Sequence, residues 1–296
     1  MSSNYNIPID FNARFMRDFI AWVNKHPELE EDDDKLEAAA ARARAKWFAA
    51  KKSWLNGISP NEYFFEIDDA AKLISLLISY IEHDMDIPEP LIDCIIDKGD
   101  DAYSLMIDII NLDDTGDISP DALEDVRTYF IDLIEEMQRD HPYSRYVTLL
   151  LKITEPGDLS ETIMRIFHSA PNTRYIRDLL FGAYPLADKY PAVIILDILT
   201  DLPDEDGRTS DLLLAAYNSG QIDLDYFATL EQSVGDERAL PLLREHLDDA
   251  DIDYFTYSEI RYAIEAITGE FILEREFPGD KDYEKIANLK EDEIFG

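Results

Sequence analysis

The sequence predicts an all-α fold of amphipathic helices stacked side by side, without a substantial sheet. Three observations lead to this prediction. Apolar residues recur at helical spacing along most of the 296 residues, related helical stretches recur along the chain, and no segment carries a strong strand pattern. Because 46% of the residues are hydrophobic, the chain is able to bury a substantial core.

The clearest pair of helices is expected in residues 236–269. The apolar stripe of the first helix consists of Ala239, Leu240, Leu242, Leu243 and Leu247, and that of the second consists of Ile260, Ala263, Ile264 and Ile267. Between them lies an acidic turn, after which Ser258 is suited to cap the second helix and Gly269 to end it. Two helices of this size cannot bury both stripes alone, so the pair needs neighbouring copies.

This pair resembles a HEAT-like repeat, in which a leucine and an aspartate end the first helix and an arginine, small residues and a glycine follow in the second. The corresponding residues are Leu247, Asp248, Arg261, Ala263, Ala266 and Gly269. The turn at 251–258 is longer than is usual in that family. The resemblance implies a right-handed α-α superhelix, a solenoid of the HEAT or armadillo kind. It implies no particular activity, because functions vary widely on such folds.

An offset of 48 residues relates this pair to an earlier stretch of the chain. The offset places Ile194, Ile195, Leu199 and Ser210 on Leu242, Leu243, Leu247 and Ser258. An extra helix is expected between successive copies, at 173–189 and at 224–233. Three helices per unit is typical of an armadillo-type repeat, and the alternative is plain helix pairs with an irregular phase.

The earlier part of the chain predicts a series of shorter helices. They are expected at 11–26, 35–55, 62–67, 69–83, 88–98 and 102–111, and Ser119-Pro120 has the form of a further helix start. The predicted divisions are an N-terminal capping region at 1–66, an acidic helical region at 67–141, the repeats at 142–269 and a tail at 270–296. In the tail we expect a short extended piece at 270–277, a weak helix at 282–291 and a mobile end.

The charge of the chain narrows the range of partners. Its 64 acidic and 27 basic residues give a net charge of −37, which repels the phosphates of nucleic acids and anionic membrane surfaces. No signal peptide and no membrane-spanning run is visible. The single cysteine, Cys94, lies in an apolar stretch and is expected in the core. These features predict a cytoplasmic protein.

One predicted helix departs from this acidic character. Residues 35–52 contain six bases, Lys35, Arg42, Arg44, Lys46, Lys51 and Lys52, and one acid, Glu37. Two interpretations are open. The helix caps the fold and turns its bases toward the acidic body of the protein, or it docks an acidic partner.

The sequence holds no pattern that predicts catalysis, a metal site or a cofactor. The five histidines do not share a helix face at metal-ligand spacing, and no nucleophile elbow or phosphate-binding loop is present. Residues 111–122 were compared with a calcium loop, but Ala122 stands where a bidentate glutamate is needed, which favours a polar turn. We therefore expect a protein that is not an enzyme and holds no cofactor or metal.

The function expected from these features is that of a helical-repeat scaffold that binds another protein through its concave face. Exposed arginines and tyrosines are expected to supply the contacts, because such residues dominate interface energies. The predicted residues are Arg174, Tyr175, Arg177, Tyr254, Tyr257 and Arg261. The alternative is an acidic inhibitor or immunity protein that neutralises a basic toxin or a nucleic-acid-binding enzyme through residues 82–125, where fifteen acids stand against one base. The oligomeric state stays open.

Overall fold

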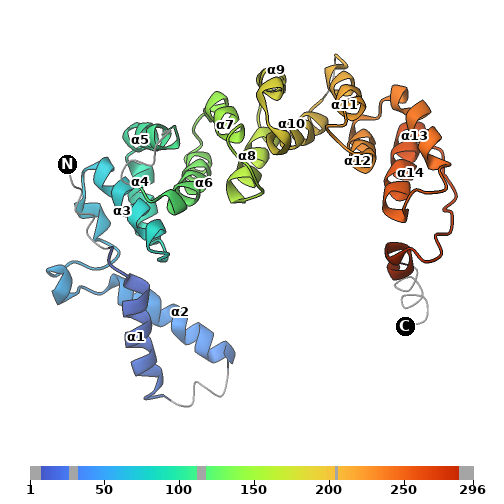
Figure 1. Cartoon of the computed structure of the whole chain (residues 1–296). Coiled ribbons are helices and arrows are strands. Elements are labelled where there is room, and N and C mark those ends of the chain that lie inside the picture. Colours follow the sequence, from blue (N-terminus) through green and yellow to red (C-terminus); the bar gives the residue numbers. More distant parts are fainter. Residues whose placement is uncertain (1–7, 27–32, 112–117, 204–205, 287–296) are drawn as a thin grey trace. The chain divides into compact units, whose positions relative to one another are not determined.

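The computed structural model describes residues 8–26, 33–111, 118–203 and 206–286. These residues contain helices and connecting turns but no strand, apart from an isolated bridge between Lys52 and Ile58. The predicted all-α class without a sheet is confirmed. The chain forms two compact units, Met1–Arg145 and Tyr146–Gly296, whose helices are shown in Figure 1. None of the described helices is long and apolar enough to cross a membrane.

The first unit contains six α-helices and two short 3₁₀ turns among its described residues. They are α1 (Phe11–Val23), α2 (Asp33–Ala49), η2 (Ser53–Leu55), η3 (Phe64–Glu66), α3 (Ala70–Glu82), α4 (Glu89–Asp97), α5 (Asp100–Ile110) and α6 (Pro120–Glu136). The predicted helices of this region are present except the one at 62–67, where only the 3₁₀ turn η3 forms, and the one at 35–55 ends early. It ends at Ala49 because Lys52 turns back to pair with Ile58, and Asn56 takes a left-handed conformation with φ of 55° in that turn.

Local capping explains where several of these helices begin. The Asp69 carboxylate accepts a bond from the Ala71 N–H, and the Ser119 hydroxyl accepts one from the Ala122 N–H, so each side chain satisfies a free backbone donor of the first turn. The predicted helix start at Ser119 is therefore confirmed. The polar turn predicted before it falls on residues 112–117, which lie outside the described residues. Cys94 is buried on α4, as expected.

The second unit contains the remaining helices. They are α7 (Tyr143–Leu150), which crosses the division between the units, α8 (Asp158–His168), α9 (Thr173–Ala183), α10 (Lys189–Asp201), α11 (Arg208–Asn218), α12 (Leu224–Val234), α13 (Leu240–Leu247) and α14 (Tyr254–Thr268), with the 3₁₀ turns η4 (Tyr184–Leu186) and η5 (Glu237–Ala239). The helices α8, α10, α12 and α14 pack on one another in that order and form one row. The helices α9, α11 and α13 lie beside them as a second row (Figure 1).

This arrangement corrects the predicted three-helix unit. The 48-residue offset places α10 on α13 and α11 on α14, and so it equates helices of different rows. Each of α9, α11 and α13 packs instead on the helix that follows it. In the described part of the second unit α11 also packs on α10, the helix before it, so the packing does not show a three-helix unit.

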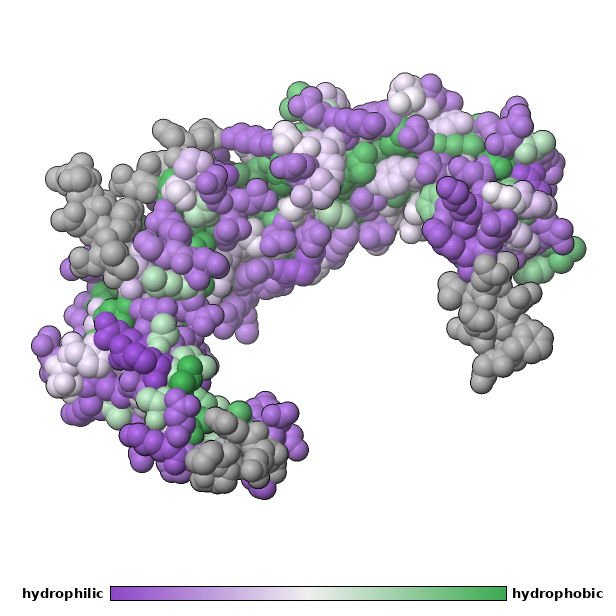
Figure 2. Space-filling view, turned by 60° about the horizontal axis from the view of Figure 1, so that its bottom comes forward, coloured by the Kyte–Doolittle hydropathy of each residue, from purple (hydrophilic) through white to green (hydrophobic). Residues whose placement is uncertain are grey.

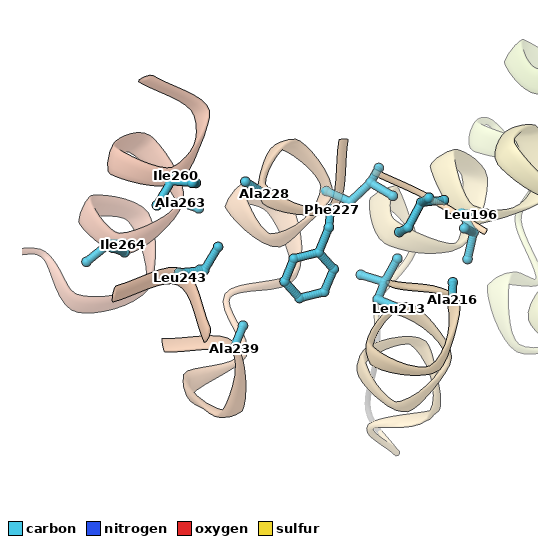
Figure 3. Packing of buried hydrophobic residues seen from close by; sticks show 12 residues of the cluster. Leu196, Leu213, Ala216, Phe227, Ala228, Ala239, Leu243, Ile260, Ala263 and Ile264 are labelled. Atoms are coloured by element: carbon cyan, nitrogen blue, oxygen red, sulfur yellow. The ribbon is translucent and has the colours of Figure 1, made fainter. Parts of the chain in front are cut away.

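The core between the two rows is formed by aliphatic side chains around one phenylalanine. Phe227 of α12 is fully buried, and its ring lies between Leu213 of α11 and Leu243 of α13 (Figure 3). Leu196 of α10 and Ile260 of α14 extend this cluster to both sides. The cluster is continuous over five helices, so it ties the pairs together and supplies the burial that a single pair lacks.

The segment after α14 lies on that helix. Residues 270–277 form no regular element, so the predicted extended piece pairs with no strand, and residues 281–286 are helical. Gly269 ends α14 with φ of 71°, the left-handed conformation that glycine adopts without a steric cost. Phe277 is buried against Tyr254 and Tyr257, which anchors the segment to α14.

Candidate functional site

The six residues predicted to bind a partner do not form one exposed surface. Arg174 and Tyr175 are exposed on α9, and the Tyr175 side chain is 46% accessible. Arg177, Tyr254, Tyr257 and Arg261 are buried, with 8% or less of each residue exposed. The expectation that all six side chains are exposed is therefore wrong for these four.

Arg177 has a structural role beneath the start of α11. Its guanidinium donates to the Leu202 carbonyl at 3.4 Å and to the Asp206 carboxylate at 3.3 Å. The carboxylate of Asp206 also accepts from Arg208 at 2.7 Å. Arg174, Arg177 and Arg208 thus share one hollow of about 330 Å³. The Asp206 carboxylate neutralises part of the positive charge of the three arginines. Desolvation raises the pKa of Asp206, but hydrogen bonds from Arg208 outweigh this effect, so the pKa is lowered overall.

Tyr254 and Tyr257 hold the segment that follows α14. The Tyr254 hydroxyl donates to Glu274 at 2.6 Å. The Tyr257 hydroxyl donates to the Leu273 carbonyl at 3.1 Å and accepts from the Arg275 N–H at 3.3 Å. Both rings also contact Phe277. These contacts place the two tyrosines inside the fold, with no surface left for a partner.

Arg261 is buried at the middle of α14 and contacts its own helix. Its guanidinium lies 3.7 Å from the Glu265 carboxylate and 4.6 Å from the centre of the Tyr262 ring. The resemblance to HEAT-like repeats implies that this arginine braces the neighbouring turn through Asp248, and the structure does not place it there. Its Nε atom has no hydrogen-bond partner among the described residues.

Polar side chains connect the exposed sides of α8, α10, α12 and α14. Tyr226 of α12 donates to Asp197 of α10 at 2.6 Å, and His168 of α8 lies 3.4 Å from Asp201 of α10. On the other side of α12, the Gln232 amide donates to Glu259 of α14 at 2.7 Å. We call this surface the row face. Its members are His168, Asp197, Asp201, Tyr226, Thr229, Gln232, Phe255, Glu259 and Tyr262.

Two exposed aromatic residues lie at the α14 end of the row face. Phe255 is 54% exposed and Tyr262 is 45% exposed. They precede and follow Glu259 by four and three residues, so all three side chains lie on one side of the helix. Thr229 and Gln232 of α12 both donate to the Glu259 carboxylate, at 2.8 and 2.7 Å, which fixes its position between the aromatic rings.

Two of the residues predicted from the sequence are the direct neighbours of these exposed aromatic residues. Tyr254 and Arg261 each precede an exposed aromatic residue by one position. One residue turns the side chain by about 100° around a helix, so the neighbour of an exposed residue points into the core. The spacing of Phe255, Glu259 and Tyr262 is visible in the sequence, but the row that packs on α14 decides which stripe stays exposed.

Two carboxyl groups of the row, Glu231 and Asp197, have raised pKa values but do not form a candidate site. Burial raises the pKa of Glu231 to about 7, against opposing hydrogen bonding from the Asp236 N–H. Burial also raises the pKa of Asp197, and the hydrogen bond from Tyr226 opposes that shift. Neither residue lines one of the hollows that the described residues of this unit form at Arg174, Met164 and Tyr190. Within the described residues no three His, Cys, Asp or Glu side chains are grouped in a way that suits a metal ion.

The acidic segment at 82–125 has several local partners. Asp100 pairs with Arg139 at 2.8 Å, the Asn12 amide donates to Asp86 at 2.7 Å, and the Ser119 N–H donates to Glu82 at 2.9 Å. These acids therefore help to hold the first unit together. Their use against a basic toxin or enzyme stays a prediction.

The comparisons leave the class of protein to be inferred from this geometry. No family model, no curated protein and no solved structure matches the chain.

Proposed function

We propose that the chain is a non-catalytic helical-repeat scaffold that binds another protein through the row face. In this proposal the helix pairs of the second unit continue as a HEAT-like, right-handed solenoid, and the row face is its binding side. The two-row packing of α8 to α14 supports this reading, because solenoids of paired helices use one row for the outer side and the other for the binding side.

The observation that carries the proposal is the group of Phe255, Glu259 and Tyr262 on α14. Two large aromatic side chains are half exposed, and a carboxylate between them is already held by α12. Rigid aromatic residues supply large contact area at a small entropic cost, and they are enriched among the residues that dominate binding energy. The two rings and the polar residues around them form a small exposed aromatic patch, and a patch rimmed by polar residues is typical of a protein-binding surface.

The charge of the row face indicates the kind of partner. Asp197, Asp201 and Glu259 lie along it, and His168 is the nearest group able to carry a positive charge among the residues that define it. A partner with apolar pockets for the aromatic rings and a basic rim complements this surface. A cytoplasmic location fits the single buried cysteine, which forms no disulfide within the chain.

The test is partner capture from an extract of the native host, with the whole chain as bait. The Phe255→Ala/Tyr262→Ala variant is expected to lose the captured protein, whereas Leu186→Ala, which removes an even more exposed apolar side chain from η4, is expected to retain it. Raising the salt concentration is expected to weaken capture, because rim charges are screened. Equal capture by both variants, or no capture by the unaltered chain at either salt concentration, would overturn the proposal.

A further inference from the structure

The first unit contains a second candidate surface, which is independent of the row face. A groove of about 610 Å³ runs between α1 and α2. Its aromatic lining consists of Phe15, Phe19 and Trp22 from α1 and Trp47 from α2, and Ala39 and Ala43 of α2 add further apolar surface. Figure 2 shows hydrophobic surface on this hairpin, bordered by hydrophilic side chains.

The aromatic lining is held in place by its own contacts. The rings of Phe15 and Phe19 stack with centres 5.5 Å apart, and Phe19 and Trp22 stack at 5.8 Å. Trp47 meets Phe15 edge-on at 6.0 Å, and its indole N–H donates to Asp18 at 2.9 Å. A surface that is ordered before binding loses less conformational entropy when a partner arrives.

The rim of the groove is positively charged. Arg42, Lys46 and Lys52 line it, and the one acid among the lining residues is Asp18, which already accepts from Trp47. Arg42 and Lys46 stand four residues apart on α2, and both are exposed. Within the described chain neither makes a hydrogen bond or an ion pair. Lys52 lies 4.0 Å from the centre of the Trp47 ring.

These contacts separate the two interpretations of the basic helix. If the helix only capped the fold, its bases would pair with acids of α3 to α6. Arg42 and Lys46 form no such pair. Arg44 differs from them: it lies over the Phe48 ring at 4.9 Å and lines a hollow that also holds Asp86, Glu89 and Asp93, so it faces acids of the first unit. Arg42 and Lys46 are therefore the two bases of the groove that are available to an acidic group outside the fold, in a chain whose net charge is −37.

We propose that this groove binds an acidic amphipathic helix of another protein. Apolar side chains of that helix, repeated every three to four residues, would fill the space over Phe19, Trp22 and Trp47, as in other helix-in-groove complexes. Its carboxylates would reach Arg42 and Lys46, which fixes the choice of an acidic partner and speeds the encounter. The chain as a whole repels anionic membranes and nucleic acids, so a peptide with a compact acidic face is favoured over both.

The experiment uses the full chain and a synthetic probe peptide of about 16 residues, long enough for roughly four helical turns. The probe carries leucines at helical spacing and glutamates elsewhere, and a matched peptide carries lysines in place of the glutamates. Binding is followed by tryptophan fluorescence and by calorimetry. The acidic probe is expected to bind, and the lysine peptide is expected to bind at least about tenfold more weakly, a difference of about 1.4 kcal/mol.

Two charge-reversal variants test whether the groove is the site. Arg42→Glu/Lys46→Glu is expected to weaken binding of the acidic probe at least about tenfold, which corresponds to about 1.4 kcal/mol. Lys25→Glu/Lys72→Glu makes the same change in net charge on exposed positions of the first unit outside the groove, and it is expected to leave binding within about twofold. Circular dichroism checks that both variants keep their helices.

Four results of the binding measurements would overturn this proposal. They are no binding of the acidic probe, equal binding of the two peptides, equal loss in the two charge-reversal variants, and preferential binding of the chain to anionic vesicles over the probe. Dimerisation that the probe does not reverse would assign the groove to a second copy of the chain, and would also overturn it. The Phe255→Ala/Tyr262→Ala variant is expected to bind the probe unchanged, so failure at the groove is distinguishable from failure at the row face.

Discussion

Arg238 and Asp211 lie 2.6 Å apart and join η5, which leads into α13, to α11, the preceding helix of the same row. Arg238 also contacts Asp236, two residues earlier, through its side chain at 2.8 Å and its N–H at 2.9 Å. Arg208 repeats this arrangement one step back. It contacts Asp206, again two residues earlier, and reaches Asp178 of α9 at 2.8 Å. An Asp-x-Arg turn therefore connects successive helices of the second row.

This connection predicts favourable coupling between Arg238 and Asp211. In a double-mutant cycle of Arg238→Ala and Asp211→Ala, the two single losses of unfolding free energy should not add, because each removes the same contact. The coupling should shrink at about 1 M salt, where charges are screened beyond about 3 Å. Urea unfolding at two salt concentrations measures it. The single contact of Arg244 with Glu270, at 3.3 Å, serves as the control and should couple more weakly. Equal coupling for the two pairs would contradict the prediction.

Because the carboxyl group of Glu231 is buried, we expect the chain to lose stability as the pH rises. This side chain is fully buried, one carboxylate oxygen accepts from the Asp236 N–H at 3.3 Å, and the other has no partner among the described residues. Its pKa is raised from 4.5 to about 7, so between these values the folded chain binds a proton that the unfolded chain releases. The contribution is present below pH 4.5 and is lost as the pH rises through about 7, by up to roughly 3 kcal/mol.

Replacing Glu231 by glutamine isolates this effect. Unfolding free energies of the Glu231→Gln variant should fall less between pH 5 and pH 8 than those of the unaltered chain, a window spanning the pKa of about 7. The variant should also be the more stable of the two at the upper end. Glu245→Gln, on the exposed side of α13, controls for the loss of one charge. Identical pH profiles for the Glu231→Gln variant and the unaltered chain would show that Glu231 is not held in this environment.

The core of the second unit predicts a large cost for removing Phe227. This ring is fully buried among side chains of four neighbouring helices, so Phe227→Ala leaves a cavity and should cost about 3–5 kcal/mol of unfolding free energy. Phe255→Ala removes the same group from a residue that is 54% exposed and should cost about 0.5 kcal/mol or less. Similar costs in thermal and urea unfolding would mean that Phe255 is part of the core.

The hydrogen bonds of Tyr257 are expected to hold the segment after α14 against that helix. The Tyr257→Phe variant loses the bonds to the Leu273 carbonyl and the Arg275 N–H, which are worth about 0.5–1.5 kcal/mol each. Hydrogen exchange should become faster across residues 271–277 while α12 keeps its protection. Tyr175→Phe, on an exposed tyrosine of α9, should change neither. Unchanged exchange at the Arg275 amide would show that this anchor is not formed in solution.

Local signals in the sequence were sufficient to predict the helices and several of their ends. Ser119 and Gly269 cap helices as expected, because capping depends on residues close in the chain. The expectation that Ser258 caps α14 is wrong, because that helix already begins at Tyr254 and Asp253 caps it. The early end of α2 was missed, since it depends on Lys52 meeting Ile58. The repeat was misread because helices of both rows carry apolar residues at similar spacing, so an offset of 48 aligns them without any structural equivalence.

The candidate site was harder to predict than the fold. Arginine and tyrosine are residue types that are common at interfaces. Arg177 and Tyr257 are nevertheless buried, because they form hydrogen bonds with backbone carbonyls of neighbouring segments. Phe255 is apolar and reads as a core residue, yet it is exposed because the stripe of α14 that packs on α12 and α13 is elsewhere. Long-range packing decides both cases, and no local pattern encodes it.

The most direct measurement of the central claim is site-specific photo-crosslinking in cells of the native host. A photoreactive phenylalanine analogue is placed at Tyr262 on the row face, or at Leu186 on η4, two exposed positions whose replacement leaves the core intact. A scaffold that binds through the row face gives a specific protein adduct from position 262 and none from position 186. An adduct from position 186 alone, or the same adduct from both positions, would contradict binding through the row face.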